Sequence, residues 1–412
     1  MHKVFIMISM VAAGEGIFLL PFVLVRVFRP TILDVFEINN LQLGLAFSAY
    51  GTVAMGSYFL GGPLADIFSA RKLMSFALVS TAIGGFVFAS VPDLNLLVVL
   101  YAFWGLTTIL LFWAALIKAT RVWGGASSQG KAYGLLDGGR GLMAALMASI
   151  AVFVFSSLLP DPAFANITEK TYALRAVILM ISFLVILIAI IVFFLVPDTP
   201  ASHDVGSIKR ISLEGLKDGL SRPSIWLQAV IVVCAYVAYK GTDDFSLYVY
   251  DTFNYDDVEA AKIASISLWV RPFAAVSAGF LGDRIQSSTV LLLGFMIIIF
   301  GSTFITFGLL GSGVYVSIVA VVVTTSIGIH ALRGVYFVLF EEAKVPLLYT
   351  GSAIGIVSFI GYTPDIFMGP LMGFLLDRSP GEVGHQHVFA LIASFAAVGL
   401  LATIIFKLIN KK

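Results

Sequence analysis

The chain has 412 residues, of which 59% are hydrophobic and only 12% are charged, and its mean hydropathy is +1.00. Because charged residues make up roughly a quarter of a soluble globular protein, this composition excludes a soluble enzyme, a disordered chain and a coiled coil, and it indicates a membrane protein. The 25 Lys and Arg residues nearly balance the 24 Asp and Glu residues, which leaves no large basic surface for nucleic acid.

Apolar runs broken by Gly, Pro and charged residues predict an all-α membrane protein with twelve spanning helices, since about 20 apolar residues cross a bilayer. The first run carries Glu15 and has no clear small-residue cleavage site, so we interpret it as a retained helix rather than a secretory signal. The predicted spans are 4–28, 41–65, 73–91, 95–117, 133–159, 173–197, 224–250, 260–282, 289–310, 313–340, 350–376 and 387–408.

A polar stretch, 198–223, is interpreted as the linker between an N-terminal bundle, 1–197, and a C-terminal bundle, 224–412. Within it, the spacing of apolar residues over 211–220 fits a short amphipathic helix on the membrane surface, and a solvated loop fits equally well. Lys and Arg concentrate in the loops on the linker side, as they do in cytoplasmic loops. We therefore expect both termini in the cytoplasm and the protein in the plasma membrane, which is the inner membrane in a bacterium.

The same phrase follows the second span of each half. Gly62-Pro63-Leu64-Ala65-Asp66 precedes Arg71-Lys72, and Gly279-Phe280-Leu281-Gly282-Asp283 precedes Arg284. Such a repeat at one point of two six-helix units is typical of transporters built from parallel repeats. A carboxylate at a tight Gly turn can accept hydrogen bonds from a helix N-terminus and pair with a base, in a contact that forms and breaks as the bundles move.

These residues resemble the cytoplasmic signature of the major facilitator superfamily, G-x-L-A-D-R-x-G-R-K, and the resemblance in architecture covers nearly the whole chain. Ile67 and Ser69 replace the usual Arg and Gly, and one extra residue precedes Arg71. This spacing resembles the organophosphate:phosphate antiporter branch more than drug exporters. The resemblance implies two pseudo-symmetric six-helix bundles. It also implies a cytoplasmic gate formed by Gly62, Asp66, Arg71, Gly279, Asp283 and Arg284.

Ionisable residues inside the predicted spans are interpreted as functional, because each costs about 2.5–3.5 kcal/mol to insert at the bilayer centre. Bases that converge from several helices would bind a carboxylate or a phosphate. A buried carboxylate that takes up a proton would release its base to the substrate. The bases are Arg26, Arg140, Lys240, Arg271 and Arg333, and the acids are Glu15, Asp137, Asp243, Asp244 and Asp365.

Some of these charges have a purely structural alternative. Arg26 can extend to the outer headgroups, and Asp137 and Arg140 can pair along one helix face. Asp243 and Asp244 lie towards the outer end of the seventh span, where one of them can be solvated. Arg271 and Asp365 are the most central by position and are the hardest to explain structurally.

The resemblance to the antiporter branch extends to parts of the site. Phe22-Val23-Leu24-Val25-Arg26 resembles its first-helix arginine region, and 123–130 with Asp137 and Arg140 resembles its fourth-to-fifth-helix stretch. The resemblance implies that Arg26, Arg140 and Lys240 line an anion site. Arg140 stands where that branch has histidine, and Arg271, Arg333 and Asp365 have no counterpart, so the resemblance does not imply a particular substrate.

Two tyrosines are assigned to the predicted cavity, and proline and glycine predict two local features of the eleventh span. Tyr239 and Tyr362 neighbour intramembrane charges and are assigned to it, whereas most other aromatic residues are expected to pack or to lie at the membrane interface. The run 361–365, which contains Pro364, predicts an interruption of the eleventh span. Gly369 and Gly373 have the G-x-x-x-G spacing that predicts a close helix contact.

Other signals are weaker. The run Gly134–Gly141 lacks the strand and the Lys-Ser or Lys-Thr ending of a phosphate-binding loop. His385-Gln386-His387 is expected in an external loop, and His330 lies one turn from Arg333. The sequence offers no combination of nucleophile, base and orienting group and no metal-ligand constellation, so no enzymatic activity, cofactor or metal is expected.

The sequence thus predicts a secondary active transporter that moves a small organic anion (a carboxylate, a sugar acid or a phosphate ester) by alternating access, with proton coupling preferred over exchange. A transporter of neutral solutes or drugs and a non-transporting sensor of the same fold are the alternatives. The expected partners are the anionic substrate, protons or a counter-anion, and the lipid bilayer. The chain is expected to be a monomer.

Overall fold

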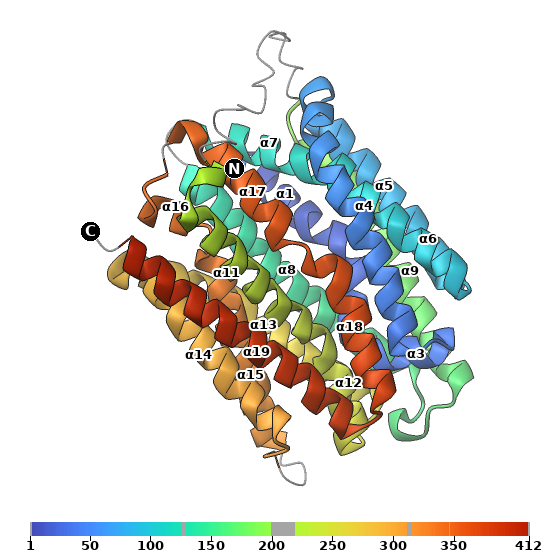
Figure 1. Ribbon diagram of the computed structural model, residues 1–412. Coiled ribbons are helices and arrows are strands. Elements are labelled where there is room, and N and C mark those ends of the chain that lie inside the picture. Colours follow the sequence, from blue (N-terminus) through green and yellow to red (C-terminus); the bar gives the residue numbers. More distant parts are fainter. Residues whose placement is uncertain (1, 126–128, 199–218, 311–314, 346, 411–412) are drawn as a thin grey trace.

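The computed structural model describes residues 2–125, 129–198, 219–310, 315–345 and 347–410, and all regular structure among them is helical (Figure 1). Twelve stretches of helix in this part of the chain are long and apolar enough to cross a membrane, as predicted. Both chain ends lie on the same side of the helical assembly (Figure 1). We call that side the termini end and the opposite side the distal end.

The N-terminal half begins with a span built from α1 (His2–Phe18), the π-helical turn η1 (Leu19–Val23) and α2 (Leu24–Val27). A short helix, α3 (Arg29–Phe36), follows at the distal end. The next spans of this half are α4 (Asn40–Ile67), α5 (Ala70–Ala89), the combined α6 (Leu94–Gly105), η2 (Leu106–Trp113) and α7 (Ala114–Gly124), then α8 (Gln129–Leu158) and, after η3 (Pro162–Phe164), α9 (Ile167–Leu195).

The C-terminal half begins with a span that combines α11 (Pro223–Lys240), the 3-10 turn η5 (Gly241–Asp244) and α12 (Phe245–Phe253). Its other spans are α13 (Asp257–Ile285), α14 (Ser287–Thr306), α15 (Tyr315–Val335), the pair α17 (Leu347–Gly361) and α18 (Pro364–Arg378), and α19 (Glu382–Ile409), with the short α16 (Leu339–Glu342) after α15. The predicted interruption of the eleventh span is confirmed, because α17 ends at Gly361 and α18 begins at Pro364.

Two helices begin earlier than hydropathy predicts, in polar residues ahead of the apolar run. The sixth span was predicted to begin at 173, yet α9 begins at Ile167, because Asn166 and Glu169 form a capping box ahead of the apolar run. The twelfth was predicted to begin at 387, yet α19 begins at Glu382. Most of the predicted linker, including most of the possible helix over 211–220, falls in 199–218, outside the described residues.

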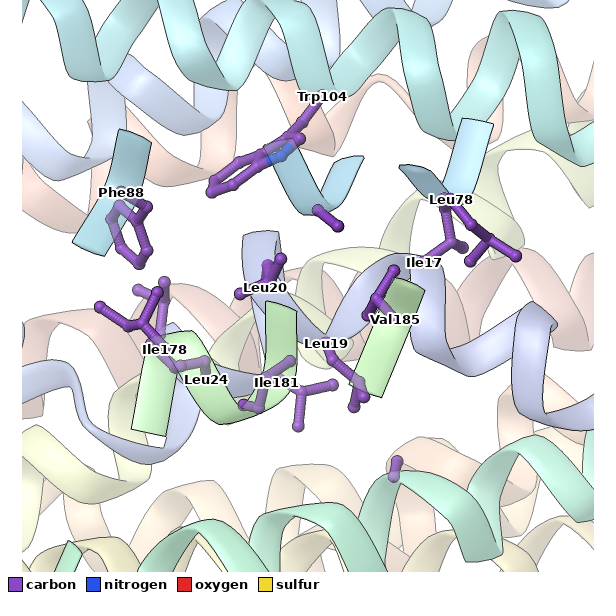
Figure 2. Close-up of a cluster of buried hydrophobic side chains, with 14 of the residues drawn as sticks. Ile17, Leu19, Leu20, Leu24, Leu78, Phe88, Trp104, Ile178, Ile181 and Val185 are labelled. Carbon is purple, nitrogen blue, oxygen red and sulfur yellow. The ribbon is translucent and has the colours of Figure 1, made fainter. Parts of the chain in front are cut away.

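The first span is packed into the N-terminal bundle around its π-helical turn. Pro21 cannot donate a backbone hydrogen bond, and its own carbonyl accepts one from the Tyr101 hydroxyl at 3.0 Å. The Trp104 indole donates to the Thr81 carbonyl at 3.2 Å, so both large rings have their polar atoms satisfied in the core. Figure 2 shows the surrounding apolar side chains: Ile17, Leu19, Leu20, Leu24, Leu78, Phe88, Ile178, Ile181 and Val185.

At the distal end the two bundles touch through glycine. A Cβ on Gly44 of α4 would collide with the backbone of Gly369 in α18, and a Cβ on Gly373 would collide with that of Asn40. The close helix contact predicted for Gly369 and Gly373 is therefore confirmed. Beside it, the Asp377 carboxylate accepts hydrogen bonds from the backbone N–H groups of Asn40 (3.1 Å) and Leu41 (2.8 Å) at the N-terminus of α4, where the helix dipole favours an anion.

Towards the termini end α4 faces α17 instead, with the Phe59 and Phe359 ring centres 5.5 Å apart, and this contact ends within one turn. Gly62 lies five full turns beyond Gly44 at about 3.6 residues per turn, so both lie on one face of α4, yet a Cβ on Gly62 would meet nothing within 4 Å. Gly141 of α8 packs against Pro272 of α13, whereas Gly134, about two turns nearer the termini, meets nothing within 4 Å. The bundles are thus packed closely at the distal end, whereas these two glycines nearer the termini end face open space.

This asymmetry predicts different effects of the same change at two glycines. Gly44→Ala forces α4 and α18 apart, and overpacking of this kind costs about 1–3 kcal/mol, so the temperature of unfolding in detergent falls. Gly62→Ala adds its methyl group to open space and leaves that temperature unchanged or raises it slightly, because Ala favours helix. Equal losses of stability in the two variants would contradict the distal contact.

Candidate functional site

The charged side chains inside the spans meet at the interface between the bundles. Glu15 of α1 lies between two arginines: its Oε2 is 3.3 Å from Nε of Arg140 in α8, and its Oε1 is 3.1 Å from Nη1 of Arg271 in α13. Arg140 also donates to the Gly14 carbonyl at 2.9 Å. Because Arg271 belongs to the C-terminal bundle, this triad of buried or half-buried charges joins the two halves.

A second ion pair joins the bundles nearer the distal end. Nε of Arg26 in α2 donates to Oδ1 of Asp243 in η5 at 2.6 Å, and the two side chains are 3% and 7% exposed. Arg29 adds a hydrogen bond from Nη1 to the Asp243 carbonyl at 3.1 Å, and the Ser246 hydroxyl donates to the Arg26 carbonyl at 2.9 Å. Pairing of this kind is what makes buried charges tolerable in a low-dielectric interior.

Lys240 of α11 links the seventh span to α18. Its Nζ lies 3.2 Å from Oδ1 of Asp365 and 3.8 Å from Oδ2 of Asp243. The Tyr236 hydroxyl donates to the same Asp365 carboxylate, with oxygen separations of 3.0 and 3.2 Å. Lys240 also lies 5.0 Å from the ring centre of Phe22 in the N-terminal bundle, so this cation faces the opposite half.

Arg333 of α15 differs from the other bases. Each of Arg26, Arg140, Lys240 and Arg271 has a carboxylate within 4.0 Å. Among the described residues Arg333 has none, and its Nη1 is buried without a hydrogen-bond partner. Its guanidinium instead lies over the ring of Tyr239, 3.7 Å from the ring centre.

Aromatic rings and one histidine surround Arg333. The Arg26 guanidinium, from the other bundle, lies 4.8 Å from the centre of the same Tyr239 ring. Nε2 of His330, one turn from Arg333 on α15, is also buried with no partner in the described part of the chain. Tyr362, which was predicted to line the cavity, packs beside Tyr236, and the centres of the two rings are 5.1 Å apart.

The structure settles the alternatives left by the sequence. Arg26 does not extend to headgroups, since it is buried against Asp243. Neither Asp243 nor Asp244 is solvated, because both are buried in η5. Asp137 and Arg140 do approach each other, at 3.8 Å, but Asp137 is 61% exposed, and Arg140 is closer to Glu15.

The expectation that His385 lies in an external loop was wrong. Hydropathy placed the twelfth span too late, and His385 lies in the first turns of α19, fully buried. Its Nδ1 is 2.7 Å from Oδ2 of Asp244, and its Nε2 is 3.2 Å from Oδ2 of Asp251. His387, two residues further on, is exposed.

Further residues of the interface were not predicted, among them Arg29 and Asp377. Arg29 falls between the predicted spans 4–28 and 41–65, yet it is 4% exposed and contacts η5. Asp377 was not singled out, although the run from Gly373 to Arg378 reads G-F-L-L-D-R and matches G-F-L-G-D-R from Gly279 to Arg284. That recurrence was the signal for the distal contact of Asp377 with α4.

The predicted gate residues lie at the termini end. Asp283 and Arg284 are exposed in the last turn of α13, and the described residues offer them no ion pair. Arg71 pairs with Asp198 at 2.9 Å within its own bundle. Gly62 and Gly279 meet nothing within 4 Å, and the side chain of Asp66 lies outside the described residues.

Comparison with known proteins supports the fold. The family model described as Major Facilitator Superfamily matches residues 4–363. Two Escherichia coli (strain K12) proteins, inner membrane protein YihN and inner membrane protein YqcE, are each 26% identical, over 380 and 385 residues respectively, covering 90% of this chain and 87% of the relative.

Solved structures agree over nearly the full length. A crystal structure of the nucleoside transporter NupG superposes with a TM-score of 0.73 at 14% identity, covering 98% of this chain and 98% of that one. A bacterial homologue of the human lysosomal transporter Spinster, in an inward-facing and unoccupied conformation, superposes with a TM-score of 0.70 at 15% identity, covering 99% and 95%.

The ion pair between Arg26 and Asp243 can be tested with a double-mutant cycle. Removing one partner of a buried pair costs about 3–5 kcal/mol, since the other charge is left uncompensated. Arg26→Gln and Asp243→Asn should therefore each lower the unfolding temperature, and the double variant should lose less than the sum of the two. Strict additivity would show that the two side chains do not interact.

Proposed function

The chain belongs to the Major Facilitator Superfamily, and we propose that it is a secondary active transporter that moves a small organic anion across the inner or plasma membrane, with both termini in the cytoplasm. The proposed substrate class is a carboxylate, a sugar acid or a phosphate ester. Substrate passes between the two bundles by alternating access, and protons are the proposed coupling ion.

The observation that carries the anion proposal is the unpaired guanidinium of Arg333. An uncompensated charge inside a membrane protein is costly, and an anion on Arg333 would remove that cost with two matched hydrogen bonds. Its neighbour His330 adds a second buried nitrogen without a partner among the described residues. The tyrosines around them, Tyr239, Tyr236 and Tyr362, offer ring faces and hydroxyls to the rest of a small substrate.

The protein's own carboxylates would compete with a substrate anion for the arginines. Arg140 and Arg271 share the single carboxylate of Glu15, so two positive charges face one negative charge. Asp137 is mostly exposed near this triad and pairs only loosely with Arg140, at 3.8 Å. A substrate anion that approaches from the termini end therefore meets a positive field around Arg140, Arg271 and Arg333, and protonation of a carboxylate there would strengthen it.

Alternating access is supported by the closure of one end only. The close distal contact through Gly44 and Asp377, with open space beside Gly62, fits one of the two states that such a transporter needs. With the termini in the cytoplasm, this state is open to the inside. The Spinster homologue with the same fold is described in an inward-facing, unoccupied conformation.

A neutral solute is the second candidate. The structural neighbour NupG is a nucleoside transporter, and every base at the interface other than Arg333 already has an internal carboxylate within 4.0 Å. On this alternative the charges serve only to hold the bundles together, and the tyrosine hydroxyls bind the substrate.

A thermal-shift screen separates these candidates. Sugar acids, dicarboxylates and phosphate esters form one set, and nucleosides and neutral sugars form the other. A ligand at 100 times its Kd stabilises the folded protein by about 2.7 kcal/mol, and we expect this shift only in the anionic set. Accumulation of the same anion in proteoliposomes then distinguishes a transporter from a sensor. A hit confined to neutral compounds would overturn the anion proposal.

Substitution of the unpaired arginine tests its role. Arg333→Gln should weaken binding of the anion from the screen at least about thirtyfold, because loss of one buried charged contact costs roughly 2–5 kcal/mol. The unfolding temperature of the empty protein should not fall, since no carboxylate loses its partner. The exposed Lys262→Gln is the control and should bind normally. Unchanged affinity in Arg333→Gln would remove Arg333 from the site.

Arg271→Gln should behave differently from Arg333→Gln. It leaves Glu15 with one base instead of two, so both the unfolding temperature of the empty protein and the anion affinity should fall. Measured in the same thermal-shift series, a loss of stability with normal affinity would show that Arg271 acts only as an internal partner.

A further inference from the structure

A second cluster of titratable groups lies in the distal half of the C-terminal bundle, apart from Arg333 and its rings. His385 of α19 is held between Asp244 at the end of η5 and Asp251 in α12, at 2.7 Å from Nδ1 and 3.2 Å from Nε2. The imidazole and Asp244 are fully buried, whereas the Asp251 side chain is 30% exposed. The cluster is therefore a buried site with one carboxylate at the surface.

The two contacts of His385 indicate which of its ring nitrogens carry protons. A neutral imidazole has one N–H and one lone pair, and an ionised carboxylate can only accept. If His385 were neutral between two carboxylates, one ring nitrogen would turn a lone pair towards a negative oxygen at hydrogen-bond distance. Both contacts are attractive when both nitrogens carry protons, and the imidazolium charge then also compensates the buried Asp244.

The charged and aromatic side chains around the cluster fit a doubly protonated His385. From α3, Nη1 of Arg29 lies 4.0 Å from Oδ1 of Asp244, an oxygen that is buried and has no hydrogen bond in the described structure. From α12, the Tyr248 ring lies 5.4 Å from the imidazole. On α19 itself Glu382 is exposed and bonds to a neighbouring side chain. The imidazolium and Arg29 thus face the two carboxylates with balanced charge.

The cluster is also tied to the contact between the bundles. Asp244 is adjacent in η5 to Asp243, which pairs with Arg26 across the interface. Arg29 donates both to the Asp243 carbonyl and to the Asn40 side chain, at 3.1 and 2.8 Å. The backbone N–H of Asn40 in turn donates to the carboxylate of Asp377 in α18, at the distal contact.

We propose that His385, Asp244 and Asp251 form a proton-binding site, occupied while the distal end is closed and reached by protons from the distal face through Asp251. When the proton leaves, Asp244 loses its positive partner and takes up Arg29 with its free oxygen, which draws Arg29 away from Asn40 and loosens the distal contact. The consequence for transport rests on the proposed function and supplies its coupling ion. The proton site itself does not depend on any substrate.

Nitrogen-15 NMR tests the proton count directly, with the proton as the only ligand. A variant in which His2, His203, His330 and His387 are replaced by Gln keeps His385 as its one labelled imidazole. We expect two protonated ring nitrogens at pH 8, where an exposed histidine with a pKa of about 6.5 is neutral. One N–H and one bare nitrogen at pH 8 would overturn the proposal, whatever anion the protein carries.

Proton titration of the otherwise unaltered protein provides the matched comparison. In weakly buffered detergent, His385→Gln should release one proton fewer per chain than the unsubstituted protein, and the missing proton should be one that leaves above pH 8. His387→Gln, which removes an exposed histidine of the same helix, is the matched control and should leave the proton release above pH 8 unchanged. If the two variants lose protons over the same range, His385 is an ordinary histidine and the proposal fails. Anion binding in the thermal-shift screen is read separately, so failure of either proposal can be recognised without the other.

Discussion

The structure depends on charges that are buried between two bundles and compensate one another across the gap. Arg26 with Asp243, and Glu15 with Arg271, each place one partner in each half. Burying such a pair gains little net free energy over an apolar contact, because both ions lose their hydration. What the pairs provide is a contact whose loss is costly unless another charge replaces the missing one. Under the proposed function, a substrate anion or a proton supplies that replacement, so the interface responds to ligands in a way that an apolar interface would not.

Small residues make this arrangement possible at one end. Gly44, Gly369 and Gly373 allow the backbones of α4 and α18 to approach, and this approach brings the Asp377 carboxylate to the N-terminus of α4. The G-x-L-x-D phrase thus has one copy engaged at the distal end, while the copy ending at Asp283 is exposed at the termini end. A phrase that is engaged at one end and free at the other is what alternation between two closures requires.

The twelve spans, the break before Pro364 and the Gly369–Gly373 contact could be predicted from hydropathy, proline chemistry and spacing, because these are local properties of the chain. Partners across the interface could not, since Arg26 and Asp243 lie 217 positions apart and their pairing depends on how the two bundles are docked. The position of His385 was predicted wrongly because hydropathy marks a helix only where its residues are apolar. The polar first turn of α19 was therefore taken for a loop. The unpaired state of Arg333 is likewise a property of the assembled site.

A ligand-bound structure in a lipid nanodisc tests the central claim most directly. With an anion that stabilises the protein, our account places the carboxylate or phosphate group against the guanidinium of Arg333 beside the Tyr239 ring. Glu15 would still lie between its two arginines or be displaced from one of them. Ligand density away from Arg333, or an Arg333 that turns to an internal carboxylate while the ligand is bound, would contradict the account.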